Sequence, residues 1–166
     1  MVLFKTLIFT ILVPGTVTIY IPYLLLSSAD ATQRLPLGAF RYFGVIPILI
    51  GAAIYFWCAW DFTFTGRGTP APIDPPKELV AKGLYRYVRN PMYVGVLTLL
   101  LGEAILFGSR ALFIYAAVAF VVYYLFVILY EEPVLRRKFG AAYQRYCAET
   151  PRWLPRWKQP GDPITR

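Results

Sequence analysis

Residues 91–107 read PMYVGVLTLLLGEAILF and residues 111–130 read ALFIYAAVAFVVYYLFVILY, with only Gly-Ser-Arg between them. Each stretch approaches the roughly 20 apolar residues that a helix needs to cross the ~30 Å hydrocarbon core of a bilayer. Because the connection is so short, the two helices must be antiparallel neighbours. The sequence therefore predicts a helical hairpin over residues 91–130 that lies in a membrane.

Two further apolar runs precede this hairpin, over residues 2–26 and 39–60. The first contains Pro14 and Pro22, which a helix in lipid tolerates by kinking. Apolar residues make up 58% of the 166 residues, above the roughly 45–50% of an ordinary soluble domain. We therefore predict an all-α fold, a single polytopic membrane domain with four transmembrane helices.

The distribution of Lys and Arg predicts the orientation of this domain, because cytoplasmic segments are enriched in them. Four spans place both termini on the same side as the connection between the second and third helices, residues 61–90. That side carries 14 of the 17 Lys and Arg residues, whereas only Arg34, Arg41 and Arg110 lie on the other. The sequence predicts an integral, multi-pass protein with cytoplasmic N- and C-termini, in which residues 1–60 form helices 1 and 2 and residues 131–166 a cytoplasmic tail.

The tail carries a further helical pattern. Leu135, Phe139, Tyr143 and Tyr146 recur at steps of four, four and three residues, which makes one apolar stripe. A net charge of +8 suits either nucleic acid or an anionic membrane surface, and the apolar content favours the membrane. We expect a C-terminal interfacial helix that rests on lipid headgroups, with membrane lipids and no nucleic acid as partners.

Two adjacent carboxylates, Glu131 and Glu132, follow the fourth apolar run directly before Pro133. A helix C-terminus disfavours anions because of the helix dipole. Two explanations remain open: one carboxylate pairs with an arginine of the loop or tail, or one binds a cationic group of a ligand.

The chain has no histidine, and Cys58 and Cys147 have no metal-binding spacing, so a metal site has no support.

The residues before the hairpin carry a resemblance. Residues 77–95 include Gly83-Leu84-Tyr85 and Arg89-Asn90-Pro91-Met92-Tyr93, and the tail adds Glu-Glu-Pro-Val-Leu at 131–135 and Pro-Arg-Trp-Leu-Pro at 151–155. In this order the motifs resemble the isoprenylcysteine carboxyl methyltransferase family over roughly the second half of the chain. Asn-Pro-Met-Tyr and Glu-Glu-Pro are also similar to segments of the membrane phospholipid N-methyltransferases. Both groups use S-adenosylmethionine without a soluble nucleotide-binding domain.

The resemblance implies a cofactor site at the cytoplasmic end of the hairpin. It implies that Glu131 holds the amino group of S-adenosylmethionine and that Glu132 is its neighbour, our candidate base for an ammonium acceptor. Other cofactor-binding residues implied in this way are Lys77, Glu78, Leu79, Val80, Tyr85, Asn90, Pro91, Met92 and Tyr93.

Some positions depart from the prenylcysteine enzymes. Lys77 and Asn90 stand where those enzymes have histidine, and Val127 stands where they have an arginine thought to bind the substrate carboxylate. A carboxylate acceptor of that kind is therefore in doubt, and the departures lean toward an aminolipid.

The implied function is methyl transfer from S-adenosylmethionine to a lipophilic acceptor in the membrane, either an aminolipid or a lipidated or small hydrophobic carboxylate or thiol. One alternative is an NADPH-dependent membrane reductase of the sterol type, which resembles this group in its C-terminal half. Another is a small transporter or accessory protein without catalysis. Almost no polar residue besides Glu103 lies within the apolar runs, which argues against a transporter. The oligomeric state is left open.

Overall fold

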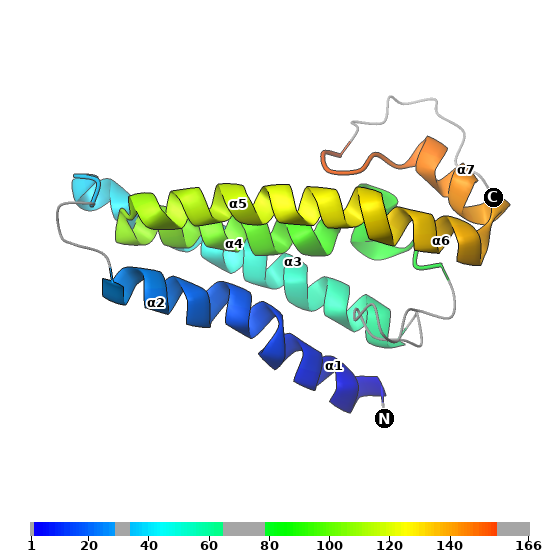
Figure 1. Cartoon of the computed structure of the whole chain (residues 1–166), viewed down its shortest axis with the longest axis horizontal. Helices are drawn as coiled ribbons and strands as arrows, with labels where there is room; N and C mark the ends of the chain where they lie inside the picture. Colours follow the sequence, from blue (N-terminus) through cyan, green and yellow to red (C-terminus); the bar gives the residue numbers. More distant parts are fainter. Residues whose placement is uncertain (1, 29–33, 65–78, 156–166) are drawn as a thin grey trace.

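The computed structural model describes residues 2–28, 34–64 and 79–155, and these residues are mainly helical. The helices in chain order are α1 (Val2–Leu12), a π-helical turn (Thr16–Tyr20), α2 (Ile21–Ser28), a 3-10 helix (Gly38–Gly44), α3 (Val45–Phe64), a 3-10 turn (Gly83–Arg86), α4 (Pro91–Phe107), α5 (Arg110–Phe126), a second π-helical turn (Val127–Glu131), α6 (Glu132–Phe139) and α7 (Ala141–Glu149) (Figure 1).

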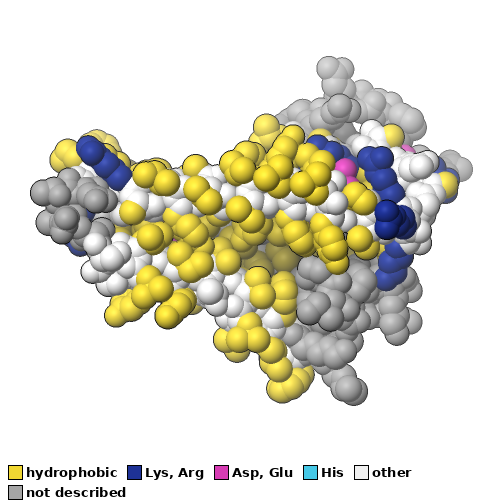
Figure 2. Space-filling view, viewed as in Figure 1, with side chains coloured by type: hydrophobic (Ala, Val, Ile, Leu, Met, Phe, Trp, Pro, Cys, Tyr) yellow, Lys and Arg dark blue, Asp and Glu magenta, His cyan; other side chains and the backbone are white. Residues whose placement is uncertain are grey.

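Three helical stretches in the described part of the chain are long and apolar enough to cross a membrane: Thr6–Ser28, Gly38–Phe64 and Arg110–Phe139. Pro91–Phe107 is also apolar but shorter. Large apolar side chains on these helices are exposed, as for Ile19 (71%) and Leu129 (72%). Figure 2 shows hydrophobic side chains along the visible face, with the Lys and Arg side chains in view at its two ends. The all-helical fold is thus confirmed, and these features indicate an integral membrane protein.

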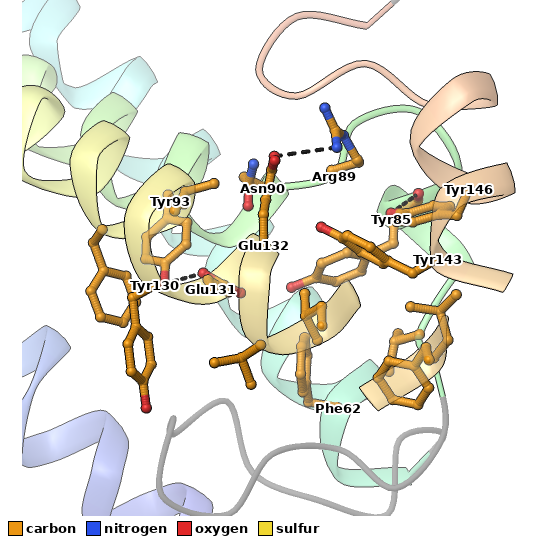
Figure 3. A pocket seen from close by; sticks show the side chains of 17 residues that line it. Phe62, Tyr85, Arg89, Asn90, Tyr93, Tyr130, Glu131, Glu132, Tyr143 and Tyr146 are labelled. Atoms are coloured by element: carbon orange, nitrogen blue, oxygen red, sulfur yellow. Dashed lines mark hydrogen bonds and ion pairs between the residues drawn. The ribbon is translucent and has the colours of Figure 1, made fainter. Parts of the chain in front are cut away.

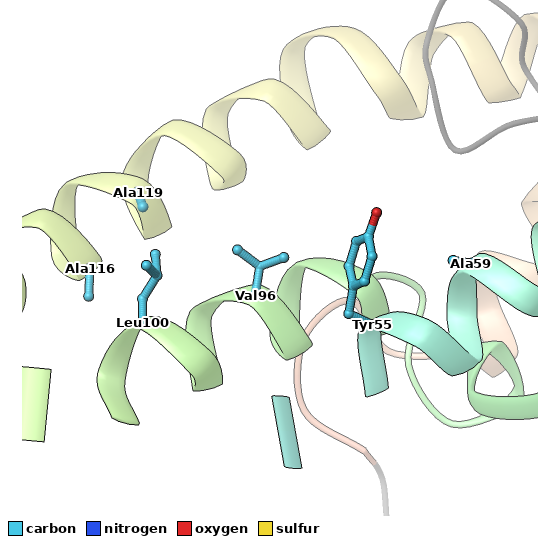
Figure 4. Packing of buried hydrophobic residues seen from close by; sticks show 6 residues of the cluster. All are labelled: Tyr55, Ala59, Val96, Leu100, Ala116 and Ala119. Carbon is cyan, nitrogen blue, oxygen red and sulfur yellow. The ribbon is translucent and has the colours of Figure 1, made fainter. Parts of the chain in front are cut away.

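The helices pack as a bundle in which α4 lies between α3 and α5 (Figure 1). We call α1, the first π-helical turn and α2 together the N-terminal helix. It crosses this bundle obliquely, since α1 contacts α3 whereas α2 contacts α5. The buried core lies along α4, where Val96 and Leu100 pack against side chains from both neighbouring helices (Figure 4). Those neighbours are Tyr55 and Ala59 of α3 and Ala116 and Ala119 of α5.

Glycines let α3 and α4 approach closely. A Cβ atom on Gly95 would lie 2.9 Å from the Gly51 carbonyl oxygen, and one on Gly102 would lie 2.7 Å from the Gly44 carbonyl oxygen. Small residues at such positions allow backbone-to-backbone packing, which drives helix association in lipid. Gly44, the last residue of the 3-10 helix that leads into α3, lies seven residues before Gly51. Gly95 and Gly102 of α4 are also seven residues apart, so each pair recurs on one face. This contact holds the start of α4 firmly against α3.

The predicted hairpin is confirmed. Helix α4 begins at Pro91, where the missing backbone donor costs nothing, and ends before Gly108. Gly108 adopts a left-handed conformation with φ of 58°, which only glycine adopts without strain. The Ser109 hydroxyl then caps α5 by accepting a hydrogen bond from the Leu112 amide at 3.4 Å.

The prediction that the fourth helix ends at Tyr130 is wrong. The helix continues from α5 through the second π-helical turn into α6, and Pro133 lies inside it. The Glu132 amide bonds to the Val127 carbonyl, five residues back, which widens the helix just before the proline. A widened turn relieves the clash that a proline ring makes with the preceding turn. Glu131 and Glu132 therefore lie within a helix and not at its end.

Two other expected boundaries also differ. Helix α3 extends to Phe64, so the connection predicted to begin at residue 61 begins later. The predicted tail helix is divided at Gly140, whose φ of 52° separates α6 from α7. The apolar stripe that includes Leu135 and Tyr143 lines a pocket that is described below.

Candidate active site

A pocket lies at the end of the bundle where α4 begins and the π-helical turn leads into α6 (Figure 3). Its empty volume, including the open solvent at its mouth, is about 840 Å³. Its walls come from the end of α3, the segment before α4, the π-helical turn, α6 and α7. The lining residues are Phe62, Leu79, Val80, Tyr85, Arg89, Asn90, Tyr93, Phe126, Val127, Tyr130, Glu131, Glu132, Val134, Leu135, Phe139, Tyr143 and Tyr146.

Most of the predicted cofactor-binding residues come together in this pocket. Leu79, Val80, Tyr85, Asn90, Tyr93 and Glu131 line it, and so does Glu132, the predicted base. Pro91 and Met92 are not among its lining residues: Pro91 is buried at the first position of α4, and Met92 packs against the core. Lys77 and Glu78 lie outside the described residues.

Glu131 is the acidic side chain that remains available to a ligand. The Tyr93 hydroxyl donates a hydrogen bond to its Oε2 at 2.9 Å, and no basic residue pairs with it among the described residues. The Tyr93 ring packs on Tyr123, with ring centroids 4.9 Å apart, which fixes the direction of that hydroxyl. Glu131 is thus a half-buried carboxylate that is oriented by a tyrosine and has no counter-charge in the part of the chain that the structure describes.

Glu132, by contrast, is buried and paired. Arg152 donates two hydrogen bonds to it, from Nε to Oε1 at 2.7 Å and from Nη2 to Oε2 at 3.1 Å. Arg89 lies 3.2 Å from Oε1, and the exposed Arg136 lies 3.8 Å from Oε2. Arginine matches a carboxylate in this two-bond geometry, which makes the contact strong and directional. The hydrogen bond to Glu132 raises the pKa of Arg152, so that guanidinium stays charged.

The same arginines tie the tail to the segment that precedes α4. The Arg89 amide bonds to the Pro151 carbonyl at 2.8 Å, and its Nη1 bonds to the Cys147 sulfur at 2.7 Å. The Asn90 side chain donates to the Arg152 carbonyl at 3.1 Å. Asn90 directly precedes the first residue of α4, but its side chain does not cap the helix. We call Arg89, Asn90, Glu132 and Arg152 the tail clamp.

Aromatic side chains form the other walls of the pocket. Tyr85 and Tyr143 are buried, and the Tyr146 hydroxyl donates to the Tyr85 carbonyl at 2.7 Å. The Phe62 ring meets the Tyr85 ring edge-on, with centroids 5.4 Å apart. Burial raises the pKa of the phenols of Tyr85, Tyr143 and Tyr146, so they remain neutral at physiological pH.

Sequence reasoning missed several of these residues. Arg89 and Arg152 both stood within the motifs that carry the resemblance, but nothing in their spacing indicated that they meet at Glu132. The general expectation that a carboxylate pairs with an arginine applies to Glu132 only. Phe62 gave no signal, because it lies just beyond the predicted second helix, in the connection expected to begin at residue 61.

The chemistry of the pocket suits a ligand with separated charges and an aromatic or cationic part. Glu131 offers a carboxylate to an amino group. Arg89 is a cation whose Nε is buried without a hydrogen-bond partner within the described ranges. Neutral aromatic rings attract a cation through their faces and stack on planar groups. These features together fit an amino-acid portion, a sulfonium and a nucleobase.

Comparisons with known proteins identify the family of this chain. No curated protein matches the chain. A model of the phospholipid methyltransferase family matches residues 40–142, which is more than half of the chain and extends from the start of the α3 region into α7. The match includes every residue that lines the pocket except Tyr143 and Tyr146. The chain therefore belongs to the phospholipid methyltransferase family.

Proposed function

We propose that this protein is an integral membrane methyltransferase that uses S-adenosylmethionine to methylate a lipophilic acceptor from the bilayer. The family carries membrane methyltransferase activity. The main observation that supports S-adenosylmethionine as the cofactor is the contrast between the neighbouring carboxylates Glu131 and Glu132. Glu132 is neutralised by arginines, whereas Glu131 lines the pocket without a cationic partner in the described structure.

The residues present fit this cofactor. Glu131 would hold the amino group, and Arg89, which lines the pocket and whose Nε has no partner in the described structure, would meet the carboxylate. The rings of Tyr85, Tyr93 and Tyr143 would surround the sulfonium and the adenine. When bound, the cofactor supplies a methyl group that is already electrophilic, so the protein mainly needs to position the reactants and exclude water.

The clamp contacts favour a positioning role for Glu132 over the predicted role as a base. Both of its oxygens accept hydrogen bonds from Arg152, and Arg89 lies against the same carboxylate. Its role as a base stays a prediction that these contacts do not test. A carboxylate or thiolate acceptor would need no base, whereas an ammonium acceptor would have to lose a proton first.

We further propose that the acceptor enters from the side, between the helices. Tyr130 lines the pocket and is also 47% exposed on the outside of the bundle. Phe126 lies one turn before it and stacks on it, with ring centroids 5.2 Å apart. An apolar gate of this kind suits a hydrocarbon chain.

In this proposal α4 completes four spans, both termini are cytoplasmic, and the whole chain forms one membrane domain.

Calorimetric titration of S-adenosylmethionine into the purified protein in nanodiscs tests the cofactor. Wild type should bind saturably, and Glu131→Gln should bind about tenfold more weakly or worse, because the variant loses a charge-assisted hydrogen bond. Glu149→Gln is a matched control, since Glu149 is an exposed carboxylate on α7 and should leave affinity unchanged.

Two results would contradict the proposal. If folded wild-type protein does not bind S-adenosylmethionine, the methyltransferase assignment fails for this cofactor, and NADPH is the next ligand to titrate. If wild type binds and Glu131→Gln binds equally well, the cofactor stands but the role of Glu131 does not. In that case Arg89→Gln would be the next variant.

A further inference from the structure

A second cavity lies away from the active site, in a groove between the N-terminal helix and the α3–α4 pair. Its space is about 1600 Å³, including its open side. The lining extends from Thr10 to Tyr23 on the N-terminal helix, a length of about 20 Å at ~1.5 Å per residue. The opposite wall includes Ile48, Ala52 and Leu99. The groove is thus long, open on one side and mostly apolar.

The groove contains one charged group. Glu103 of α4 is the only charged side chain among the described residues that line it. Its Oε2 is buried and has no hydrogen-bond partner in the described structure. No basic side chain pairs with Glu103 within the described ranges. A carboxylate in an apolar, lipid-embedded site is costly unless something pairs with it.

The other buried and half-buried polar side chains of the groove have partners within the protein. The Thr10 hydroxyl and the Tyr55 hydroxyl bond to each other at 2.9 Å, and the Thr18 hydroxyl donates to the Pro14 carbonyl at 2.8 Å. Glu103 is therefore the group whose bonding an occupant would complete. It lies 12 residues along α4 from Pro91, about 18 Å from the active-site end, so this groove is a separate site.

We propose that the groove binds an amphiphile with an aliphatic chain and a primary ammonium group, and that the ammonium pairs with Glu103. The apolar walls match the chain, and the carboxylate matches the charge. In a low-dielectric site a carboxylate is stabilised best by a cation that also donates hydrogen bonds to it. This site goes beyond the proposed methyl transfer and does not depend on it.

Native mass spectrometry of the purified protein in detergent micelles tests this site with hexadecylamine as the probe and hexadecanol as the uncharged comparison. Wild type should retain the amine at lower concentration than the alcohol. Glu103→Gln should bind the amine about tenfold more weakly, as expected for the loss of one charge-assisted hydrogen bond. Glu149→Gln removes an exposed carboxylate and should bind the amine as wild type does.

A second variant tests the space instead of the charge. Ala52→Phe places a ring in the groove and should weaken retention of the amine and of the alcohol alike. Both groove variants should keep the helical circular dichroism of wild type. The proposal is overturned if wild type retains amine and alcohol equally, if Glu103→Gln retains the amine as wild type does, or if Ala52→Phe has no effect. Binding of S-adenosylmethionine does not enter these outcomes, so the two proposals fail separately.

Discussion

At the residue scale, Glu131 and Glu132 show how neighbouring carboxylates acquire different roles. Glu132 is 5% exposed and bound by arginines from two segments, whereas Glu131 accepts a hydrogen bond from Tyr93 and lines the pocket (Figure 3). Removal of one partner from a buried ion pair leaves the other charge uncompensated. Substitutions at Glu132 should therefore affect stability first, and those at Glu131 ligand binding first.

Arg152→Ala should lower the free energy of unfolding by ~1–3 kcal/mol, because Glu132 loses its two-bond partner while Arg89 remains at 3.2 Å. Arg152→Lys should recover only part of this loss, since a lysine cannot reproduce the paired geometry. Unfolding in mixed micelles of increasing SDS content measures both variants. In the Glu132→Gln background, Arg152→Ala should cost less than it does alone.

Equal losses of unfolding free energy for Arg152→Ala with and without Glu132 would contradict the tail clamp, because a double-mutant cycle reports coupling between two residues.

The sequence indicated both carboxylates and even offered arginine pairing as an explanation. It could not indicate which carboxylate is paired. Arg152 is 20 residues from Glu132 and Arg89 is 43 residues before it, so only the folded arrangement brings them together.

At the element scale, the second π-helical turn places Glu131 in the pocket. A π-helical turn inserts one residue relative to a regular helix, so reversion would rotate the preceding residues by about 100° relative to α6. Pro133→Ala restores a backbone donor and should favour a regular helix here. We expect weaker binding of S-adenosylmethionine, about tenfold, without any loss of stability. Titration calorimetry and SDS unfolding of the same samples measure the two effects, and unchanged affinity would show that the turn does not depend on the proline.

The glycine contact between α3 and α4 gives another prediction at this scale. Gly95→Ala would bring a Cβ atom to 2.9 Å from the Gly51 carbonyl oxygen and should destabilise the protein by ~1–3 kcal/mol. Gly15→Ala is a matched control in the N-terminal helix, because its Cβ atom would meet only the Thr10 carbonyl oxygen at 3.5 Å. SDS unfolding of both variants measures the difference. Equal stabilities would mean that the two helices can separate at no cost.

The elements were predictable where the sequence carries local signals. Pro91 and Gly108 mark the ends of α4, and the structure places its ends there. The continuation of α5 into α6 was not predictable in this way, because Pro133 ordinarily disrupts a helix. The glycines of α3 and α4 were also missed, since a glycine in an apolar run shows its role only when the facing helix is known.

At the scale of the whole molecule, apolar runs and charge determine most of the architecture. They predicted an all-helical membrane protein, and the described residues agree with this. The pocket was harder to predict because its walls are far apart in the chain. Bonds such as those from Asn90 to Arg152 and from Tyr146 to Tyr85 join residues about 60 positions apart. Only the family motifs indicated that these segments belong together.

The orientation in the membrane gives the last prediction. Cys58 is 0% exposed and should not react, and Cys147→Ser removes the remaining thiol while keeping an acceptor for Arg89. Single cysteines in this background then report on each side: Arg110→Cys at the exposed start of α5 and Gln144→Cys on the exposed surface of α7. In sealed right-side-out vesicles a membrane-impermeant maleimide should label only Arg110→Cys.

Gln144→Cys should be labelled only after detergent opens the vesicles, because the excess of Lys and Arg retains the tail on the cytoplasmic side. Labelling of Gln144→Cys alone in sealed vesicles would mean that the predicted spans are right but that the predicted orientation is inverted. Labelling of both positions would mean that the stretch Arg110–Phe139 does not cross the membrane, although it is long and apolar enough to do so. At about 45 Å it exceeds the ~30 Å hydrocarbon core, so α6 and the pocket beside it should reach the interface at which a soluble cofactor and a lipid-borne acceptor can meet.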